Sequence, residues 1–496
     1  MDTGTAGSAA TPGQTIGEAL DEAPLSLFHL KAAVTSAMGF FTDAYDLFII
    51  GVAITLVKSE WHLSAVQTSF LGSATLIATL VGAVVCGRLA DVFGRKSVYG
   101  VVAMIMAGGA IATALAPSYI WLVVFRFVLG IGIGGDYPVS AVLISEYANK
   151  ARRGLLVSLV FSAQAAGLVM GPVVALCLLA SGVNHDIAWR LMLGLGALPA
   201  LSVIYLRRSM PESPRFAAAV QGREDEARAS LARYSQGVVH SAAGPTQRVH
   251  SSLRSFLTTR RSLRLILGTA GSWFLLDYVY YGNTISAPQV LRAVAPSTDL
   301  LHTTAWTLII FSLFAVPGYV LAFLRIDHIG HRRLQWIGFL GMAACFACIG
   351  LIPGLTKAVV PFLLLYGVSY FFTEFGPNVT TFVIPTEVFG VGERSTGHGI
   401  AAGVGKLGAF IGVFVFPLEA AAFGLGGTLL LCAVLGLAGA LLTQILPEPG
   451  GLSLDALAGS SASGQVAPRP AASVLVASEA LNGEHAAKEL VTDPVA

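Results

Sequence analysis

Charged residues are scarce in this sequence. Only 12% of its 496 residues are Asp, Glu, Lys or Arg, whereas soluble domains carry about 25%. Hydrophobic residues make up 55% of the chain, and its mean hydropathy is +0.73. This balance excludes an ordinary soluble domain and indicates an integral membrane protein. The net charge of +2 is small, and no basic patch favours a nucleic-acid partner.

Cysteine is also rare, and its positions argue against a metal or redox centre. The five cysteines, Cys86, Cys177, Cys345, Cys348 and Cys432, all lie in apolar stretches. Cys345 and Cys348 form a CxxC without flanking His or Cys ligands, so a packing role is favoured. The sequence has no metal-ligand spacing, nucleophile motif or phosphate-cradling glycine loop. We therefore predict no metal, no cofactor and no enzymatic activity.

Long apolar runs are abundant. About twelve stretches have the roughly 20 residues that cross the hydrocarbon layer as a helix. They begin near Lys31, Gln67, Ser97, Ile120, Gly154, Ala188, Leu263, His302, Leu334, Val359, Ser395 and Gly424. The predicted fold is therefore all-α, integral to the membrane, with twelve transmembrane helices in two pseudo-symmetric six-helix bundles.

The distribution of Lys and Arg predicts the orientation in the membrane. Residues 1–26 lack the basic segment of a secretory signal. Basic residues cluster in alternate loops, which places those loops on the cytoplasmic side. The clusters are Arg88 to Lys96, Lys150 to Arg153, residues 207–264, Arg325 to Arg333, and Arg394. We expect a multi-pass plasma-membrane protein with both termini in the cytoplasm.

Polar stretches divide the chain into five predicted segments. These are a disordered cytoplasmic tail (1–26), an N-terminal bundle (27–207), a cytoplasmic linker (208–262), a C-terminal bundle (263–447) and a second disordered cytoplasmic tail (448–496). In the linker, Ser213 to Tyr234 predicts an amphipathic helix with Ser213 as its N-cap and Pro214 in its first turn.

Polar residues inside the apolar runs repeat between the two halves. Asp43 ends FFTD in the first run, as Asp277 ends FLLD in the seventh. Further pairs keep the chain order: Glu146 and Arg153 match Glu387 and Arg394, Tyr137 matches Asn378, and Gln164 lies close to the position of Lys406. Such a repeat is typical of transporters, whose substrate site lies between the repeats.

Asp277 is the most informative of these residues. Trp273 precedes it by four positions and Tyr281 follows by four, so all three project from one face of a helix. A carboxylate at bilayer depth costs about 2.5 to 3.5 kcal/mol, which makes such acids rare unless they face a cavity, an ion or a partner. The stripe therefore predicts a binding surface.

One loop carries a recognisable motif. GRLADVFGRK, from Gly87 to Lys96, resembles the loop signature of the major facilitator superfamily. The resemblance implies that Asp91 contacts a helix end and that basic residues such as Arg95 stay at the cytoplasmic surface. A second copy after the eighth run is degraded to RIDHIGHRR around Asp327.

Three stretches resemble the phosphate:proton symporters of that superfamily. They are GGDYPVSAVLISE from Gly134, WFLLDYVYYG from Trp273, and EFGPNVTTFVIPTEVF with the following RSTGHGIAAGVGKLGA. MPESPRF at Met210 is shared with sugar porters. The resemblance spans roughly residues 28–447.

The resemblance also implies roles for individual residues. Those around the phosphate would be Tyr137, Gln164, Trp273, Asp277, Tyr281 and Asn378, with Lys406 nearby. The proton route would use Asp43, Asp46, Asp136 and Asp277. Two alternatives stay open: Asp46 near a helix end facing water, and Asp136 in a structural hydrogen bond with Tyr137. Glu146 with Arg153, and Glu387 with Arg394, are expected as gating or structural ion pairs.

These residue types suit a protonatable anion. Monobasic phosphate has hydroxyl donors and charged oxygens, so its site needs acceptors as well as donors. Asp277 would accept from a phosphate hydroxyl, or donate when protonated, whereas sulfate offers no such proton. Lys406 would attract the anion, or neutralise Asp43 or Asp277 when no substrate is bound.

The predicted function is proton-coupled import of inorganic phosphate by alternating access through a central cavity. The membrane potential opposes anion entry by about 2.3 kcal/mol per charge per 100 mV, which more than one proton would overcome. The alternatives are a proton symporter of the same fold for a sugar or organic anion, and a non-transporting membrane nutrient sensor. The expected partners are phosphate, protons and the lipid bilayer, with no protein partner evident.

Overall fold

Long helices dominate the computed structural model, which describes residues 15–208, 210–234, 249, 252–455 and 457. Ten helical segments are long and apolar enough to cross a membrane. One of these, α20 (Arg394–Thr443), joins two spans at a kink where Gly424 has a φ of 69°. α13 (Arg260–Ile285) is a further long helix whose polar residues lower its hydropathy. The described residues thus contain the twelve predicted spans, and Gly424 starts the last one as expected.

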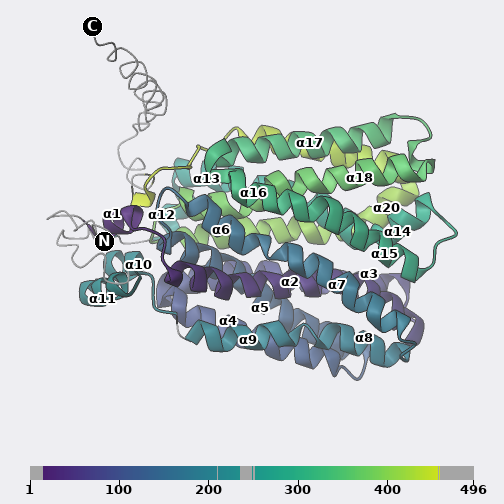
Figure 1. Cartoon of the computed structure of the whole chain (residues 1–496), viewed down its shortest axis with the longest axis horizontal. Coiled ribbons are helices and arrows are strands. Elements are labelled where there is room, and N and C mark those ends of the chain that lie inside the picture. Colours follow the sequence, from purple (N-terminus) through teal and green to yellow (C-terminus); the bar gives the residue numbers. More distant parts are fainter. Residues whose placement is uncertain (1–14, 209, 235–248, 250–251, 456, 458–496) are drawn as a thin grey trace, which may run out of the picture. The chain divides into compact units, whose positions relative to one another are not determined.

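Each half contributes six spans. In the N-terminal half these are α2 (Leu27–Glu60), α3 (Ala65–Phe93), α4 (Arg95–Ala114), α5 (Tyr119–Tyr147), α6 with α7 (Arg153–Ser162 and Gln164–Ala180), and α8 with α9 (His185–Gly194 and Ala197–Arg208). In the C-terminal half they are α13, α15 with α16 (Leu300–Ile310 and Val316–Ile329), α17 (His331–Leu351), α18 with α19 (Val359–Thr373 and Val379–Val388), and the two parts of α20. In Figure 1, α16, α17 and α18 lie in the upper part, and α4, α5, α8 and α9 in the lower part.

Two spans of the C-terminal half contain a π-helical turn. One turn, η1 (Phe311–Ala315), joins α15 to α16, and the other, η3 (Glu374–Asn378), joins α18 to α19. Such turns interrupt the regular hydrogen-bond ladder and are frequent at functional sites. Two shorter elements, α14 (Ala287–Val294) and the 3-10 turn η2 (Leu355–Lys357), lie in connections between spans.

Small residues bring the two halves into close contact. A Cβ atom on Gly87 of α3 would lie 2.5 Å from the carbonyl oxygen of Ser395, and one on Gly399 of α20 would lie 2.4 Å from that of Ala83. Within the halves, a Cβ atom on Gly134 would lie 2.0 Å from the Thr79 carbonyl oxygen, and one on Gly408 would lie 2.2 Å from that of Phe274. Only glycine permits these approaches, so the backbones pack directly.

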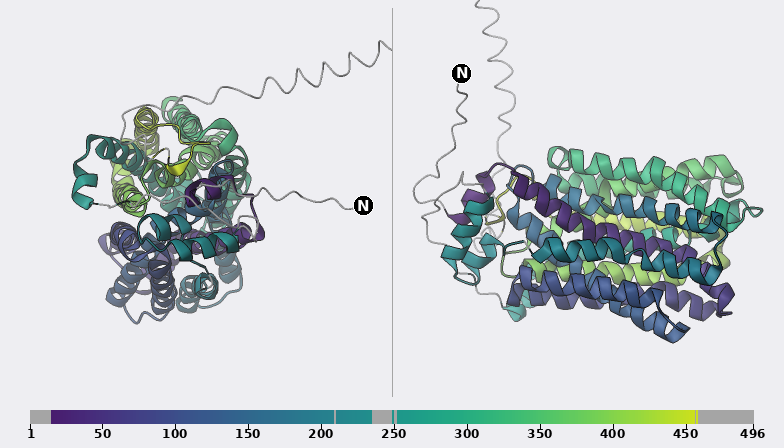
Figure 2. Two further views of the ribbon diagram at one scale, coloured as in Figure 1. Left: turned by 90° about the vertical axis from the view of Figure 1, so that its left-hand side faces the viewer. Right: turned by 60° about the horizontal axis from the view of Figure 1, so that its bottom comes forward.

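Four short helices gather at one end of the spans: α1 (Ile16–Glu22), α10 (Pro214–Ala219), α11 (Glu224–Tyr234) and α12 (Leu253–Thr258). The left view of Figure 2 looks at this end. We call it the basic end, because Arg95, Arg153, Arg215 and Arg394 lie there in a network of ion pairs.

The linker and the tails differ in part from the predictions. The Ser213 hydroxyl accepts a hydrogen bond from the Phe216 N–H, which confirms the predicted cap. The single predicted helix is instead two, because the chain turns at Gly222 with a φ of 68°. The expected disorder is wrong for residues 15–22, since a capping box starts α1 at Thr15 and Asp21 is buried. Residues 1–14 and 458–496 lie outside the described residues.

Candidate functional site

Asp277 faces the interior of the protein, as its stripe predicted. Its side chain is 1% exposed, and the Lys406 ammonium of α20 lies 3.0 Å from its Oδ2 atom. The same Lys406 Nζ atom donates to the Tyr281 hydroxyl at 2.8 Å. Lys406 therefore neutralises Asp277 in this conformation. This is one of the two roles that the sequence left open for Lys406.

Asp43 has a different set of partners. The Tyr137 hydroxyl donates to its Oδ2 atom at 2.5 Å, and the Gln164 amide donates to the same oxygen at 3.2 Å. Both donors are neutral, and all three side chains are at most 3% exposed. Asp43 thus lies in a closed hydrogen-bonded cluster formed by α2, α5 and α7.

A chain of hydrogen bonds extends this cluster into the C-terminal half. The Tyr319 hydroxyl of α16 donates to the Gln164 Oε1 atom at 3.2 Å. The Asn378 amide donates to the Tyr319 hydroxyl at 2.7 Å, and also to the Glu374 carboxylate. These hydrogen bonds therefore connect the two halves through Gln164 and Asn378, which were expected around the substrate, and through Tyr319, which was not.

The two clusters are contiguous. The Lys406 Nζ atom lies 4.8 Å from the centre of the Tyr137 ring and 4.3 Å from that of Tyr281. The Trp273 ring lies 6.0 Å from the Tyr137 ring. The structure therefore brings the predicted substrate residues together between the halves, from α5, α7, α13, η3 and α20.

Aromatic side chains cover this group of residues on two sides. Toward the basic end, Phe382 packs against Phe161 with 4.4 Å between ring centres and against Phe40 at 4.9 Å. Toward the other end, Phe48 stacks on Tyr281 and contacts Phe311. The expected central cavity is closed here, because the polar side chains bond directly to one another beneath these rings.

Two residues that belong to this group were missing from the set predicted from the sequence. Glu374 is 0% exposed, and Tyr319 is equally buried. Nothing in the sequence distinguishes Tyr319 from other aromatic residues in the spans. Glu374 did carry a signal, since it is an acid inside an apolar run four residues before Asn378, the same feature that drew attention to Asp277.

The other two predicted acids form ion pairs with arginine. Asp46 accepts from Arg126 through both carboxylate oxygens, at 3.2 and 3.0 Å. Asp136 lies 2.6 Å from Arg207. Both acids are at most 3% exposed. The alternative of a water-facing Asp46 is therefore wrong, and so is a bond between Asp136 and Tyr137, whose hydroxyl donates to Asp43.

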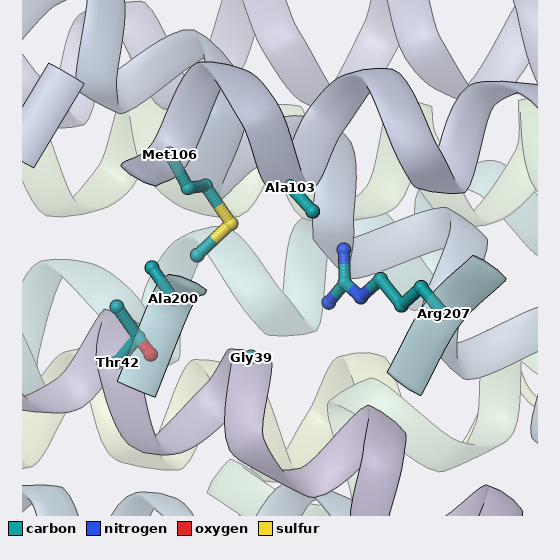
Figure 3. Close-up of a pocket in the computed structure, with 6 residues that line it drawn as sticks. All are labelled: Gly39, Thr42, Ala103, Met106, Ala200 and Arg207. Carbon is teal, nitrogen blue, oxygen red and sulfur yellow. The ribbon is translucent and has the colours of Figure 1, made fainter. Parts of the chain in front are cut away.

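Figure 3 shows a small pocket beside this second ion pair. It lies between α2, α4 and α9, and its lining consists of Gly39, Thr42, Ala103, Met106, Ala200 and Arg207. Most of these side chains are small or apolar. The pocket borders Arg207 and is separate from the group around Asp277 and Lys406.

The predicted ion pairs at the basic end exist with exchanged partners. Arg394 pairs with Glu146 at 2.9 Å, and Arg153 approaches Glu387 at 3.7 Å. Pairing within each half, as the sequence suggested, is wrong. Each Glu ends one span and each Arg begins the next, and the turn between them directs the Arg toward the opposite half.

The loop motif behaves only partly as its resemblance implied. Asp91 accepts from the backbone N–H groups of Ser395 and Thr396 at 3.3 and 2.7 Å, so it does contact a helix end, that of α20. Arg95 is not at the surface. It is 0% exposed, pairs with Asp91 and Glu146 at 3.1 and 3.2 Å, and its charge is balanced by these acids.

The residues that the structure describes contain no group of three or more His, Cys, Asp or Glu side chains that could hold a metal ion. The site consists of carboxylates, phenols, amides and one ammonium group. These groups bind protons and anions without further ligands.

Twelve spans in two repeated halves, with a buried polar site between them, define a membrane transporter of the major facilitator superfamily. The family model described as sugar (and other) transporter matches residues 31–458, and the chain belongs to this family. Inorganic phosphate transporter 1-6 of Oryza sativa subsp. japonica is 34% identical, with 92% of this chain and 97% of the relative covered. Probable inorganic phosphate transporter 1-6 of Arabidopsis thaliana is also 34% identical, covering 89% and 96%.

Solved structures share the fold. The proton:xylose symporter XylE bound to 6-bromo-6-deoxy-D-glucose has a TM-score of 0.75 at 21% identity, covering 88% of this chain and 99% of that one. The human organic anion transporter MFSD10 has a TM-score of 0.61 at 17% identity, covering 84% and 99%.

Proposed function

We propose that this protein imports inorganic phosphate together with protons across the plasma membrane by alternating access. The observation that carries the proposal is the enclosed cluster of Asp277, Lys406 and Tyr281 between the two halves. The relatives named as inorganic phosphate transporters support the choice of substrate. The positive-inside rule assigns the basic end, and with it both termini, to the cytoplasm.

The ion pair between Asp277 and Lys406 suggests how a proton and an anion are coupled. While Asp277 is ionised, it holds the ammonium group and repels an anion. When a proton from water forms an O–H bond on Asp277, Lys406 is free to attract a phosphate oxygen, and the new hydroxyl donates to the anion. Release reverses these steps on the cytoplasmic side. Phosphate therefore binds with a proton.

Neutral donors complete the proposed substrate site. Tyr137 and Gln164 now donate to Asp43, Gln164 also donates to Tyr137, and Asn378 donates to Tyr319. Phosphate oxygens would replace these internal bonds, so the site offers donors without fixed positive charge. Because the donors come from both halves, bound phosphate would hold the halves together before they rock to the other side.

Uptake of labelled phosphate into proteoliposomes tests the proposal, with and without an imposed proton gradient. Wild type is expected to accumulate phosphate only with the gradient, and Asp277→Asn to lose this dependence. Asp186→Asn is the matched control, because it removes an acid from a partly exposed pair with Arg190 and should transport normally. Accumulation of phosphate by wild type without the gradient would refute the proposed coupling to protons. Accumulation of a sugar or an organic anion instead of phosphate would refute the proposed substrate, and no transport at all would favour a sensor.

A further inference from the structure

Glu374 is a buried acid that the coupling described above does not use. It begins the π-helical turn η3 between α18 and α19, and it is 0% exposed. One carboxylate oxygen accepts from the Asn378 amide, whereas the Oε1 atom is buried without a hydrogen-bond partner. The hydroxyl of Tyr280, which interacts with Glu374, also lacks a partner. Two unsatisfied oxygens therefore lie together in the C-terminal half.

Glu374 differs from three other acids of the interior in forming no ion pair with a cation, a feature that it shares with Asp43. Asp277 pairs with Lys406, Asp46 with Arg126 and Asp136 with Arg207. Among the described residues, no Lys, Arg or His forms an ion pair with Glu374. Its neighbours are the phenols of Tyr280 on α13, Tyr319 on α16 and Tyr370 on α18, and the acid Asp277 repels its negative charge.

This environment favours the neutral form of the carboxyl group. A buried ionised carboxylate without a cation beside it is unfavourable in low dielectric, and an acid nearby adds repulsion. A protonated Glu374 would instead have a hydroxyl to donate, and the free Tyr280 oxygen is available to accept it. The geometry of the closed conformation can thus accommodate a proton at this position.

Glu374 is also connected to the site. From Glu374 the hydrogen bonds run through Asn378 to Tyr319, and from Tyr319 to Gln164 of the other half. The bond between Tyr319 and Gln164 crosses from one half to the other, so it must break when the halves rock apart. The π-helical turn supplies a locally irregular backbone at which the helix can bend. Opening therefore changes the surroundings of Glu374.

We propose that Glu374 is a proton-coupling residue, which binds a proton when the carrier loads and releases it after the halves have changed sides. This proposal rests on the proposed phosphate transport. In the outward-open state the carboxylate takes a proton from water and forms an O–H bond. In the inward-open state water reaches the group, the O–H bond breaks, and the proton passes to water on the cytoplasmic side. Glu374 thus adds one proton to each cycle.

The test compares two activities of Glu374→Gln in proteoliposomes. Phosphate counterflow, with equal pH on both sides, requires no net proton movement and should persist. Accumulation driven by a pH gradient should fall about tenfold per pH unit, because each coupled proton contributes that factor at equilibrium. Glu419→Gln is the matched control, since Glu419 is a buried glutamate of α20 that bonds to Tyr278 away from the site, and both its activities should match wild type.

Two results would overturn the proposal: accumulation by Glu374→Gln equal to wild type, or counterflow that falls in parallel with accumulation, as expected for a merely structural residue. Glu374→Asp keeps a carboxyl group and should retain accumulation with a changed pH of half-maximal accumulation. That variant decides the question if the Gln variant does not fold, and an unchanged midpoint would count against coupling. Failure of wild type to transport phosphate would instead refute the proposed function itself.

Discussion

At the basic end, each half has a network of equivalent charged residues, but the two networks do not hold the opposite half equally closely. On the N-terminal side the network consists of Asp91, Arg95, Glu146 and Glu212, with Arg394 from the other half. On the C-terminal side it consists of Asp327, His331, Glu387 and Glu448, with Arg153 from the other half. The degraded motif copy thus keeps its geometry, with His331 in the place of Arg95.

The corresponding distances show the difference. Glu146 lies 2.9 Å from Arg394, whereas Glu387 lies 3.7 Å from Arg153. Arg95 also donates to the Val391 carbonyl across the interface at 2.8 Å. Arg153 is instead shared with Asp21 of α1, at 2.9 Å. The N-terminal network therefore binds the halves directly, while the C-terminal network depends partly on the N-terminal helix.

The largest effect is expected from Glu146→Ala. Its Oε1 atom contacts both Arg95 and Arg394, so its removal leaves two buried guanidinium groups with too little negative charge. Removing one partner of a buried pair costs about 3 to 5 kcal/mol. Glu387→Ala should cost less, because Arg153 keeps Asp21 and His331 keeps Asp327. Thermal unfolding in detergent measures both variants.

Opening of the basic end gives a second measurement of the same difference. Ser395 is buried where α20 meets α3, so a Ser395→Cys reporter should be alkylated faster in the Glu146→Ala background than in the Glu387→Ala background. Glu224→Ala, which removes an exposed pair with Arg228, serves as the control. Equal labelling in the two backgrounds would show that the halves close with equal strength.

Exchanging the cations tests whether His331 and Arg95 are equivalent. Arg95→His should destabilise the protein by about 1.5 to 3 kcal/mol, the typical contribution of a hydrogen bond to a charged group. The imidazole is too short to keep the Val391 carbonyl contact as well as both acids. His331→Gln removes the charge on the other side and should cost less. Arg95→His should therefore have the lower melting temperature, and a lower melting temperature for His331→Gln would contradict this comparison.

Asp21→Asn should affect only the C-terminal network. Asp21 pairs with Arg153 and with Arg215, and Arg215 also pairs with Asp455. Each arginine thus keeps a second acid, so we expect a loss of about 1 to 3 kcal/mol. In double mutants, Asp21→Asn should be non-additive with Glu387→Ala and additive with Glu146→Ala, since coupling requires shared partners. Additivity in both double mutants would show that α1 does not contribute to closing the basic end.

Much of this arrangement could be predicted from the sequence. The spans follow from hydropathy, and Gly424 was correctly placed between the last two. Asp277 was located by its period of four with Trp273 and Tyr281, because a single helix fixes which side chains share a face. Local spacing is sufficient for such features.

Partner choice between elements could not be predicted. Glu146 has the same spacing to Arg153 as Glu387 has to Arg394, so the sequence cannot distinguish pairing within a half from pairing across halves. The closed cavity depends on which conformation is populated, and no sequence motif determines that conformation.

The glutamates that follow the last span of each half were also overlooked. Glu212 follows Arg95 by 117 residues, and Glu448 follows His331 by the same 117.

These two glutamates allow the smallest and sharpest comparison. Glu212 accepts from the first N–H groups of α4, at 3.2 and 3.3 Å, and Glu448 accepts from those of α17, at 2.8 and 3.1 Å. Replacing either by Gln should cost about 1 kcal/mol, as for other N-terminal caps. The halves would be equivalent at this position if the two losses agree.

The pH dependence of stability gives a further test of Glu212. Burial raises the pKa of Glu212 above its ordinary value of 4.5, although Arg95 opposes the shift. The folded state therefore holds this proton more tightly than the unfolded state does. The free energy of unfolding should fall as the pH rises from the unfolded pKa through the raised folded one. Glu212→Gln lacks this titration, so its difference from wild type should be largest at low pH and shrink as pH rises. Thermal unfolding between about pH 4 and 8 measures this, and a slope in Glu212→Gln equal to that of wild type would assign the dependence to another group.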